Sequence, residues 1–400
     1  MYSVRALSAI AMAITAGVVS SGCSSPETPP KSPTATETTA SATSSEITVW
    51  LNSEQSLGLE VIAAQFFADT GVAVELVTKE DPAGEVLAGV GGPDVLVDSY
   101  ESVPELVAGG RIQTFDVVND KLIAGSVQAF SFQGLQYGLP LFQENIALVC
   151  NSEAVPSAPE TFDEAVETGL AISLNNGTGD PYHFYPLQSS FGSSIFEVSS
   201  ADSAAPILAL DSEQGYAFAS WLGENRSIFD LESDTRKIKD QLVAGEKACW
   251  ITGPWNAAWF TEQFGESGWS AYPIPAAGEF PAAPFLGVTG AMLGVDSVDA
   301  KTATKFITAY LGSKLGQLAL FQTTGMSPSH LEALDEATTS KVAHEFGLAG
   351  VSGVPMPAID QMDSVWGPLG TAQASIIAGS DDPAVIWKQM ADEINAMIGN

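Results

Sequence analysis

Strand-like and helix-like patterns alternate along the chain from Ile47 to the C-terminus. Short runs rich in β-branched residues predict strands, and apolar residues spaced three or four apart predict helices. The expected strands cover 47–51, 72–77, 95–97, 145–150, 172–174, 248–251, 285–289 and 291–295. The expected helices cover 57–67, 82–89, a helix ending at Gly109-Gly110, 181–191, one or two within 205–228, a helix from 256, 300–310, 316–322 and 368–398. This alternation predicts an α/β fold with mostly parallel sheets.

The first 46 residues have a different pattern. Arg5 precedes the apolar stretch 6–19, and small residues lead to Cys23, so residues 1–22 read as a signal peptide. Gly22-Cys23 resembles a bacterial lipobox, which predicts lipidation of Cys23, although Ser20 replaces the usual Leu. An ordinary signal peptide with an incidental Cys is the alternative. This reading places the mature protein on the outer face of the cell membrane.

Residues 23–46 form the expected lipid anchor and linker. Besides Pro, residues 24–46 contain no apolar side chain larger than Ala. Such a segment cannot bury enough surface to fold, so it is predicted to be disordered. As a coil it would span roughly 25–30 Å, which suits a tether between a lipid and a folded domain.

Composition narrows the possible functions. The chain has 400 residues, 45% of them hydrophobic, and a formal charge of −33 from 48 acidic and 15 basic residues. It can therefore bury a large core, and two lobes are expected. The negative charge argues against nucleic acid and anionic lipid headgroups as ligands.

Sequence signals for catalysis and cofactors are missing. The chain has no Gly-x-Ser-x-Gly elbow, dinucleotide fingerprint or phosphate loop. Its histidines, His183, His330 and His344, lack zinc-site spacing. We therefore expect no enzyme activity, no cofactor and no metal, with His183 in a pocket wall or in the core. Cys150 and Cys249 lie in strand-like runs and could form one disulfide or remain two buried thiols.

The stretch 247–260 points to a binding site. Gly253 and Pro254 end a strand, and Trp255 follows directly at the carboxyl end of the strand, where open α/β sheets bind ligands. A core position for Trp255 is the alternative. The stretch resembles the GPW segment of the maltose/maltodextrin-binding family of ABC-transporter solute receptors, in which this Trp stacks on a sugar ring.

Further segments resemble motifs of that family and occur in the same order, from Ile47 to the C-terminus. They are WLNSE (50–54), PDVLVDSYE (93–101), PLFQEN (140–145), DPYHFYP (180–186) and MPAIDQMDSVW (356–366). The resemblance implies a monomeric, two-lobed periplasmic-binding-protein type II fold with crossings between the lobes near 142–144, 285–291 and 327–332. The N-terminal lobe would hold 47–142 plus 291–328, and the C-terminal lobe 143–290 plus 329–400.

The resemblance also implies a function. The protein would be a lipid-anchored receptor that binds a di- or oligosaccharide, maltose-, maltodextrin- or trehalose-like, between its lobes and delivers it to an ABC permease. The positions that match the family's ligand-binding residues are Asn52, Glu54, Asp98, Glu101, Glu144, Asp180, Tyr182, Trp255 and Trp366.

Three positions depart from the family pattern. Gln55 stands where the family often has Lys, Asp98 where it often has Trp, and Ser102 where it often has Arg. One aromatic platform and cleft bases are thus missing, which favours a shorter or different sugar than a long maltodextrin.

Two other functions remain open from the residues. Acids and aromatic rings also suit a cation, so a polyamine receptor of the same fold is the first alternative. A glycoside hydrolase that uses two of the acids as acid and base or nucleophile is the second.

Overall fold

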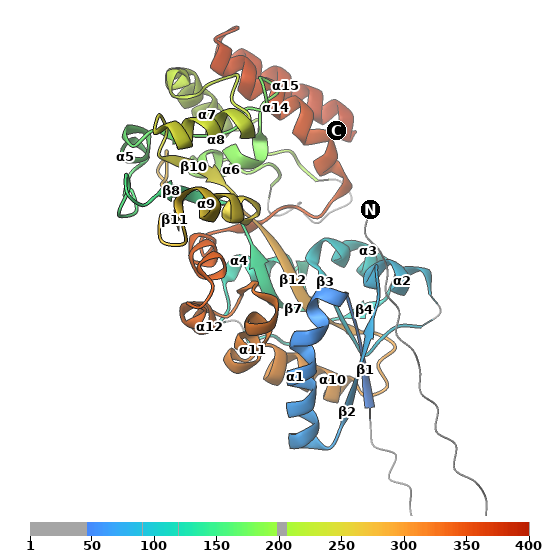
Figure 1. Ribbon diagram of the computed structural model, residues 1–400. Coiled ribbons are helices and arrows are strands. Elements are labelled where there is room, and N and C mark those ends of the chain that lie inside the picture. Colours follow the sequence, from blue (N-terminus) through green and yellow to red (C-terminus); the bar gives the residue numbers. More distant parts are fainter. Residues whose placement is uncertain (1–45, 90, 119, 198–205, 400) are drawn as a thin grey trace, which may run out of the picture. The chain divides into compact units, whose positions relative to one another are not determined.

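The structure is a computed structural model that describes residues 46–89, 91–118, 120–197 and 206–399 (Figure 1). The expected signal peptide, the lipidation site Cys23 and nearly all of the linker lie outside the described residues. The segment from Ser44 to Asn400 forms one compact unit by itself.

Two separate sheets organise the described residues. The larger has eight strands in the order β13-β7-β12-β3-β1-β2, with β4 and β14 also pairing with β12. The smaller has four strands in the order β11-β8-β10-β9, and β5 and β6 form a hairpin. The strands are β1 Glu46–Leu51, β2 Ala73–Thr78, β3 Val95–Ser99, β4 Ile112–Gln113, β5 Ser131–Phe132, β6 Leu135–Gln136, β7 Gly138–Glu144, β8 Ala147–Asn151, β9 Leu170–Ala171, β10 Cys249–Thr252, β11 Trp269–Tyr272, β12 Phe285–Gly294, β13 Ser327–Pro328 and β14 Val354–Pro355.

Helices cover both sheets. They are α1 Ser53–Thr70, α2 Pro82–Ala88, α3 Val103–Ala108, α4 Ala124–Ala129, α5 Phe162–Glu167, α6 Pro181–Ser189, α7 Glu213–Glu224, α8 Thr235–Ala244, α9 Ala257–Phe264, α10 Ala300–Lys305, α11 Lys314–Thr324, α12 Leu331–Glu336, α13 Gly347–Ala349, α14 Asp363–Ala378 and α15 Pro383–Ile398. Short 3-10 turns cover Tyr100–Ser102, Arg226–Ile228, Pro254–Asn256 and Asp360–Met362, and π-helical turns cover Phe306–Leu311 and Val342–Phe346. Several helices begin with an acidic or hydroxyl cap, such as Asp234 before α8, which satisfies a free backbone N–H.

Each sheet has its own hydrophobic core. Leu148 of the smaller sheet packs in one core with residues of α6, α7, α14 and α15. Val49 and Val97 of the larger sheet pack with α1, α10 and α11 on one face. Leu96 and Met292 point to its other face, where Tyr100 and Phe130 cover them. The predicted two-lobed α/β class is therefore confirmed, while the division of the chain between the lobes stays a prediction.

The strand directions are mixed, and the expectation of mostly parallel sheets is wrong in this detail. β1 pairs in parallel with β2 and β3, as β10 does with β9 and β12 with β14. β12 is antiparallel to β3, β4 and β7, and β8 is antiparallel to β10 and β11. A βαβ crossover makes successive strands parallel, but β12 enters the larger sheet from the core of the smaller one, so this constraint does not act on it.

Three of the expected strands differ in their limits. The strand expected at 172–174 is wrong, because the strand is Leu170–Ala171 and the Leu174 N–H donates to the Ser233 carbonyl at 3.1 Å instead of a sheet neighbour. The two strands expected on either side of Gly290 form one strand, β12, with an irregularity between Thr289 and Gly290. A Cβ at Gly290 would lie 2.5 Å from the Phe130 ring, so only glycine permits this close packing.

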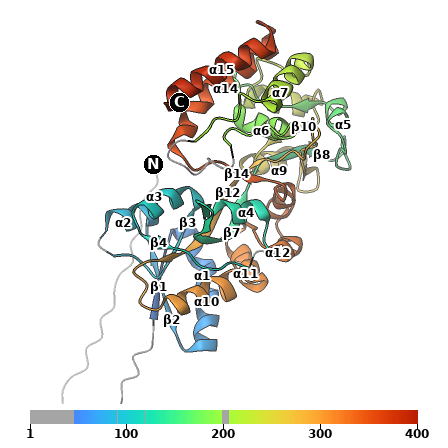
Figure 2. The ribbon, with the colours of Figure 1, turned by 180° about the vertical axis from the view of Figure 1, so that it is seen from behind.

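β7 and β12 lie between the two groups of elements in both ribbon views (Figures 1 and 2). β7 ends at Glu144, and after two intervening residues β8 begins in the smaller sheet. β12 begins at Phe285, whose ring belongs to the smaller sheet's core, and continues into the larger sheet. These two strands therefore connect the lobes covalently.

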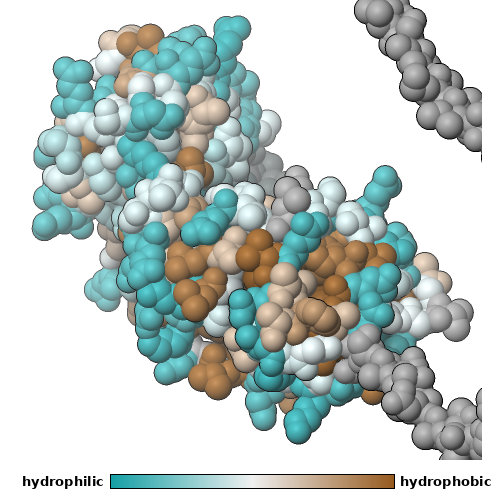
Figure 3. Space-filling model, turned by 60° about the horizontal axis from the view of Figure 1, so that its bottom comes forward, coloured by the Kyte–Doolittle hydropathy of each residue, from teal (hydrophilic) through white to brown (hydrophobic). Residues whose placement is uncertain are grey.

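Some apolar side chains remain on the surface. On α1, Val61 is 55% and Phe67 is 53% exposed, and apolar residues gather in brown on one face in Figure 3. Among the helices of the described residues, none has the length and apolar character needed to span a bilayer.

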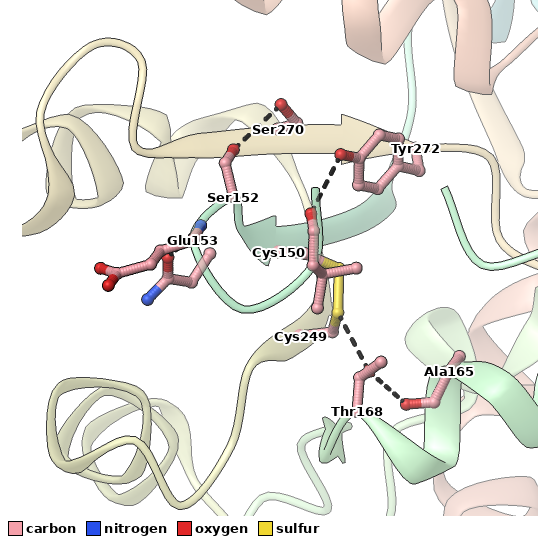
Figure 4. The surroundings of a disulfide bond; sticks show 10 residues. Cys150, Ser152, Glu153, Ala165, Thr168, Cys249, Ser270 and Tyr272 are labelled. Carbon is pink, nitrogen blue, oxygen red and sulfur yellow. Dashed lines mark hydrogen bonds between the residues drawn. A yellow bond between two sulfur atoms is a disulfide. The ribbon is translucent and has the colours of Figure 1, made fainter. Parts of the chain in front are cut away.

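Cys150 and Cys249 form a disulfide (Figure 4). They face each other in the antiparallel pairing of β8 with β10, and both are fully buried. The Thr168 hydroxyl contacts the Cys249 sulfur at 3.5 Å. The bond thus links strands that are 99 residues apart in the sequence.

We expect the double variant Cys150→Ala/Cys249→Ala to lower the free energy of unfolding by about 2–5 kcal/mol, because the bond restricts the unfolded chain over a long loop. Denaturant titration followed by circular dichroism measures this loss. The wild type unfolded with a reductant serves as the control and should approach the variant's midpoint. An oxidised wild type with the same midpoint as the variant would contradict the prediction.

Candidate functional site

Trp255 lies on the surface at the end of β10. It belongs to the turn Pro254–Asn256 that precedes α9, and 54% of its surface is exposed. Its ring packs directly over Gly253, since a Cβ there would come within 2.1 Å of the indole carbons. The buried Asn256 amide donates to the Thr252 hydroxyl at 2.9 Å and fixes the turn. The ring is thus held in place without being part of the core.

A series of rings connects Trp255 with Trp366. The edge-to-face contact of Trp255 with His183 has a centroid distance of 6.1 Å, and that of His183 with Tyr182 5.5 Å. Tyr182 stacks on Phe285 at 6.2 Å, and Phe285 meets Trp366 edge-on at 6.4 Å. We call these five residues the ring series. Such rings present apolar surface with polar atoms at their edges.

Asp180 fixes the start of α6. It is the N-cap residue, and its carboxylate accepts from the His183 N–H at 3.3 Å and contacts the His183 ring Nδ1 at 2.8 Å. The Asn175 amide also donates to it at 3.2 Å. Asp180 is only 9% exposed, so the structure uses its carboxylate to orient His183 beneath Trp255. It does not line the cavity described next.

Glu101 and Glu144 line a cavity of about 340 Å³, which we call the carboxylate cavity. Glu144 is the last residue of β7, and Glu101 lies in the turn after β3. Pro254, the neighbour of Trp255, also lines it, and no lysine or arginine is among its lining residues. The cavity therefore offers acceptors beside an aromatic platform and no positive charge.

The charge of Glu144 acts on Tyr182, a member of the ring series. The walls around its carboxylate displace water, although the residue is solvent-accessible, and this desolvation raises the pKa of Glu144. Burial, together with the carboxylates of Glu144 and Asp180, raises the pKa of the Tyr182 phenol to about 12. Glu144 thus lies close enough to act on Tyr182, and Tyr182 stays a neutral donor at physiological pH.

The structure does not bring the remaining expected residues to the carboxylate cavity. The Asp98 carboxylate accepts from the Ala83 N–H of α2 at 2.9 Å and from the Ser99 N–H at 2.7 Å, and burial raises its pKa. Asn52 is half-buried between β1 and α1. Glu54 falls in the first turn of α1, and its side chain is outside what the structure describes.

Several residues at this site were not expected from the sequence. Ser99 and Thr289 line the carboxylate cavity and face each other in the pairing of β3 with β12. Phe285 joins the two halves of the ring series. Strand alternation next to Asp98 could have indicated Ser99, because neighbouring residues in a strand point to opposite faces. No local signal marks Phe285, whose role depends on contacts with α6 and α14.

The described residues contain no group of three His, Cys, Asp or Glu side chains arranged to hold a metal ion. His183, the histidine nearest the site, has its ring Nδ1 on Asp180.

Residues 61–346, more than half of the chain, match the family model described as bacterial extracellular solute-binding protein. The chain belongs to this family. It is thus a solute-binding protein of the kind that acts outside the cytoplasm, built on the two-lobed fold.

Particular relatives share the fold and about a quarter of the sequence. A maltooligosaccharide ABC transporter solute-binding lipoprotein of Streptococcus pneumoniae is 25% identical over 377 residues, covering 86% of each chain. A galactooligosaccharide-binding protein of Bacillus subtilis is 22% identical over 384 residues, covering 90% of each. The structure of a cyclo/maltodextrin-binding protein with maltotetraose superposes with a TM-score of 0.74 at 22% identity, covering 88% of this chain and 97% of that one.

We expect Glu144→Gln to be more stable than the wild type at pH 7 and closer to it at pH 4. Because desolvation raises the pKa of Glu144, the folded state binds its proton more tightly than the unfolded state. Stability is therefore lost as the pH rises from the ordinary value of 4.5 through the folded pKa. Melting temperatures at several pH values measure this difference.

Glu262→Gln, on the exposed face of α9, is the matched control and should show no such pH-dependent gain. The prediction fails if Glu144→Gln melts below the wild type at pH 7 or if its gain is equal at both pH values.

Proposed function

We propose that the protein is a receptor that binds a di- or oligosaccharide, maltose-, maltodextrin- or trehalose-like, and delivers it to an ABC permease. The observation that carries the proposal is the ring series from Trp255 to Trp366 beside the carboxylate cavity of Glu101 and Glu144. The relatives named for maltooligosaccharide and galactooligosaccharide binding support the same class of ligand.

The site suits the two surfaces of a sugar. The C–H faces of a pyranose pack on aromatic rings, while its hydroxyls donate to carboxylates. A hydrogen bond to a charged group contributes about 1.5–3 kcal/mol net. Two ring contacts and several such bonds, less the cost of ordering, are compatible with roughly −8 kcal/mol, a micromolar affinity. Trp255 and Trp366 would supply the stacking, and Glu101, Glu144 and Tyr182 the hydrogen bonds.

The charge of the cavity narrows the ligand further. Its lining contains two carboxylates and no base, so an anionic sugar such as a uronic acid or a sugar phosphate would be repelled. Asp98 holds α2 through backbone hydrogen bonds at a position where the family often has a Trp platform. A ligand shorter than a long maltodextrin fits this reduced platform.

Sugar binding would change the arrangement of the lobes, and the protein would not catalyse a reaction. A sugar held by groups of both lobes binds the closed arrangement better and shifts the population toward it. Glu101, Glu144 and Thr289 come from strands of the larger sheet or from their ends, whereas Trp255 and Tyr182 belong to elements around the smaller one. The permease would then recognise the closed form.

Two alternatives make different predictions at the same cavity. A polyamine would pair with Glu101 and Glu144, and a glycoside hydrolase would use two carboxylates on a scissile bond. Thermal-shift assays with maltotriose, trehalose and spermidine separate sugar from cation. Release of glucose from maltotriose at a useful rate would replace the receptor proposal by the hydrolase.

The proposal includes anchoring through Cys23 and a monomeric mature protein. Gly22-Cys23 and the following linker motivate it, and a relative named as a lipoprotein supports it. We expect Cys23→Ala to release the protein into the medium or to block its processing, as judged by fractionation and immunoblotting. Cys23→Ala protein that is processed and still retained in the membrane would contradict anchoring.

We expect Trp255→Ala and Trp366→Ala each to weaken sugar binding by about 5- to 150-fold, from a loss of about 1–3 kcal/mol of stacking, taking base–aromatic stacking as the analogy. For Trp255, which is 54% exposed, the melting temperature should change little. Calorimetric titration with maltotriose and thermal melts measure the two quantities.

Two other tryptophans provide controls. Trp259→Ala, in α9 and outside the ring series, should leave affinity unchanged. Trp269, which is 1% exposed, should cost about 3–5 kcal/mol of folding stability when truncated to Ala. Intact affinity in both Trp255→Ala and Trp366→Ala would remove the main support for a carbohydrate ligand.

A further inference from the structure

A second cavity has a lining different from that of the carboxylate cavity. It has a volume of about 370 Å³, and none of the nine residues expected to bind sugar lines it. Tyr100, Val103 and Ala129 form one wall, and Tyr185 and Ile195 form another. We call it the apolar cavity. Its volume lies within the usual range of small-molecule sites.

The walls of the apolar cavity belong to different cores. Tyr100 and Ala129 pack with Leu96 and Met292 of the larger sheet. Tyr185 and Ile195 pack in the core of the smaller sheet. A change in the arrangement of the lobes therefore moves one wall relative to the other and changes the size of the cavity.

The lining is mostly apolar and contains no charged side chain. No Asp, Glu, Lys or Arg residue lines the cavity, and the segment 354–358 adds a valine, three further apolar side chains and an alanine. Tyr185 and Phe285 stack with their centroids 3.6 Å apart and an interplanar angle of 11°, which gives the cavity a flat aromatic wall. A charged ligand would lose its hydration here without gaining a partner.

The two tyrosine hydroxyls of the lining differ in their hydrogen bonding. The Tyr100 hydroxyl donates to the Met356 carbonyl at 2.9 Å. Tyr185, in contrast, is 6% exposed, and its hydroxyl makes no hydrogen bond with the residues that the structure describes. Because none of those residues takes it up, this hydroxyl is available to a molecule in the cavity.

We propose that the apolar cavity is a second binding site, for a neutral planar molecule that forms one hydrogen bond with the Tyr185 hydroxyl. The stacked pair of Tyr185 and Phe285 supplies the flat contact surface. The net charge of −33 and the uncharged lining both disfavour an anion. This site goes beyond the proposed sugar receptor, since none of the nine residues expected to bind sugar lines it.

The second site is coupled to the first through the lobes. A molecule that fits one arrangement of the two walls shifts the population toward that arrangement. By linkage, sugar then changes the affinity for this molecule, and the molecule changes the affinity for sugar by the same factor. Phe285 is common to both sites, because it lines the apolar cavity and belongs to the ring series.

The probe for the test is N-phenyl-1-naphthylamine, which is neutral and planar in each ring, carries one N–H and fluoresces in apolar surroundings. We expect saturable binding of one probe to one protein molecule. Ser194→Phe and Gln128→Phe place a ring on the lining of the cavity and should each weaken probe binding by about tenfold or more, as overpacking does. Ser220→Phe, on the exposed surface of α7, is the matched control and should have no effect.

Unchanged probe binding in both Ser194→Phe and Gln128→Phe would overturn the site. Trp255→Ala should leave probe binding unchanged, and maltotriose should shift the probe's affinity by a finite factor that saturates. Unlimited competition by maltotriose, with probe binding lost in Trp255→Ala, would show a single shared site and overturn the second one. No shift at saturating sugar would overturn the coupling.

The test separates this proposal from the proposed function. If neither maltotriose nor trehalose binds, the sugar receptor fails, and the probe titrations of the two cavity-filling variants still decide whether the apolar cavity binds a ligand.

Discussion

The pairing of β12 with β3 and β7 is the constraint on which the rest of the structure depends. Gly290 to Met292 lie between these two strands in the larger sheet. At the other end of the same strand, Phe285 packs in the core of the smaller sheet, while its neighbour Leu286 packs in a core of the larger one. A single strand thus belongs to the packing of both lobes, and its first residues lie where the lobes meet.

The candidate site follows from this arrangement. Phe285 completes the ring series, and Gly287 and Thr289 line the carboxylate cavity two and four residues further along β12. β7 delivers Glu144 opposite Gly287. The ionised Glu144 carboxylate is partly desolvated there, so the fold gives up some stability to present a strong acceptor, a common property of binding sites.

β12 and the end of β3 contribute residues to both cavities. Ser99 and Glu101 line the carboxylate cavity, and Tyr100, between them, lines the apolar cavity. On β12, Gly287 belongs to the first and Phe285 to the second. Residues that are close in the chain therefore line two cavities, of which one carries carboxylates and the other carries no charge. This arrangement permits two ligands whose binding is coupled.

Local sequence patterns were sufficient to predict many of the helices, strands and turns of this protein. The β-branched run of β1, the capped start of α6 at Asp180-Pro181 and the Gly-Pro turn before Trp255 each depend on neighbouring residues. The order of the motifs from Asn52 to Trp366 was enough to indicate the family, which the match over residues 61–346 confirms. Exposure of Trp255 agrees with its place after a turn.

Tertiary structure decided what depends on distant partners. Asp98 and Asp180 look like ligand acceptors in the sequence, but backbone N–H groups and the His183 ring occupy their carboxylates. The antiparallel direction of β12, the disulfide between Cys150 and Cys249 and the contacts of Phe285 all join segments far apart in the chain. Sequence fixes the type of each side chain and its local backbone preference. Which carboxylate faces solvent and which is taken up by a hydrogen bond is set by packing between elements, which no local pattern records.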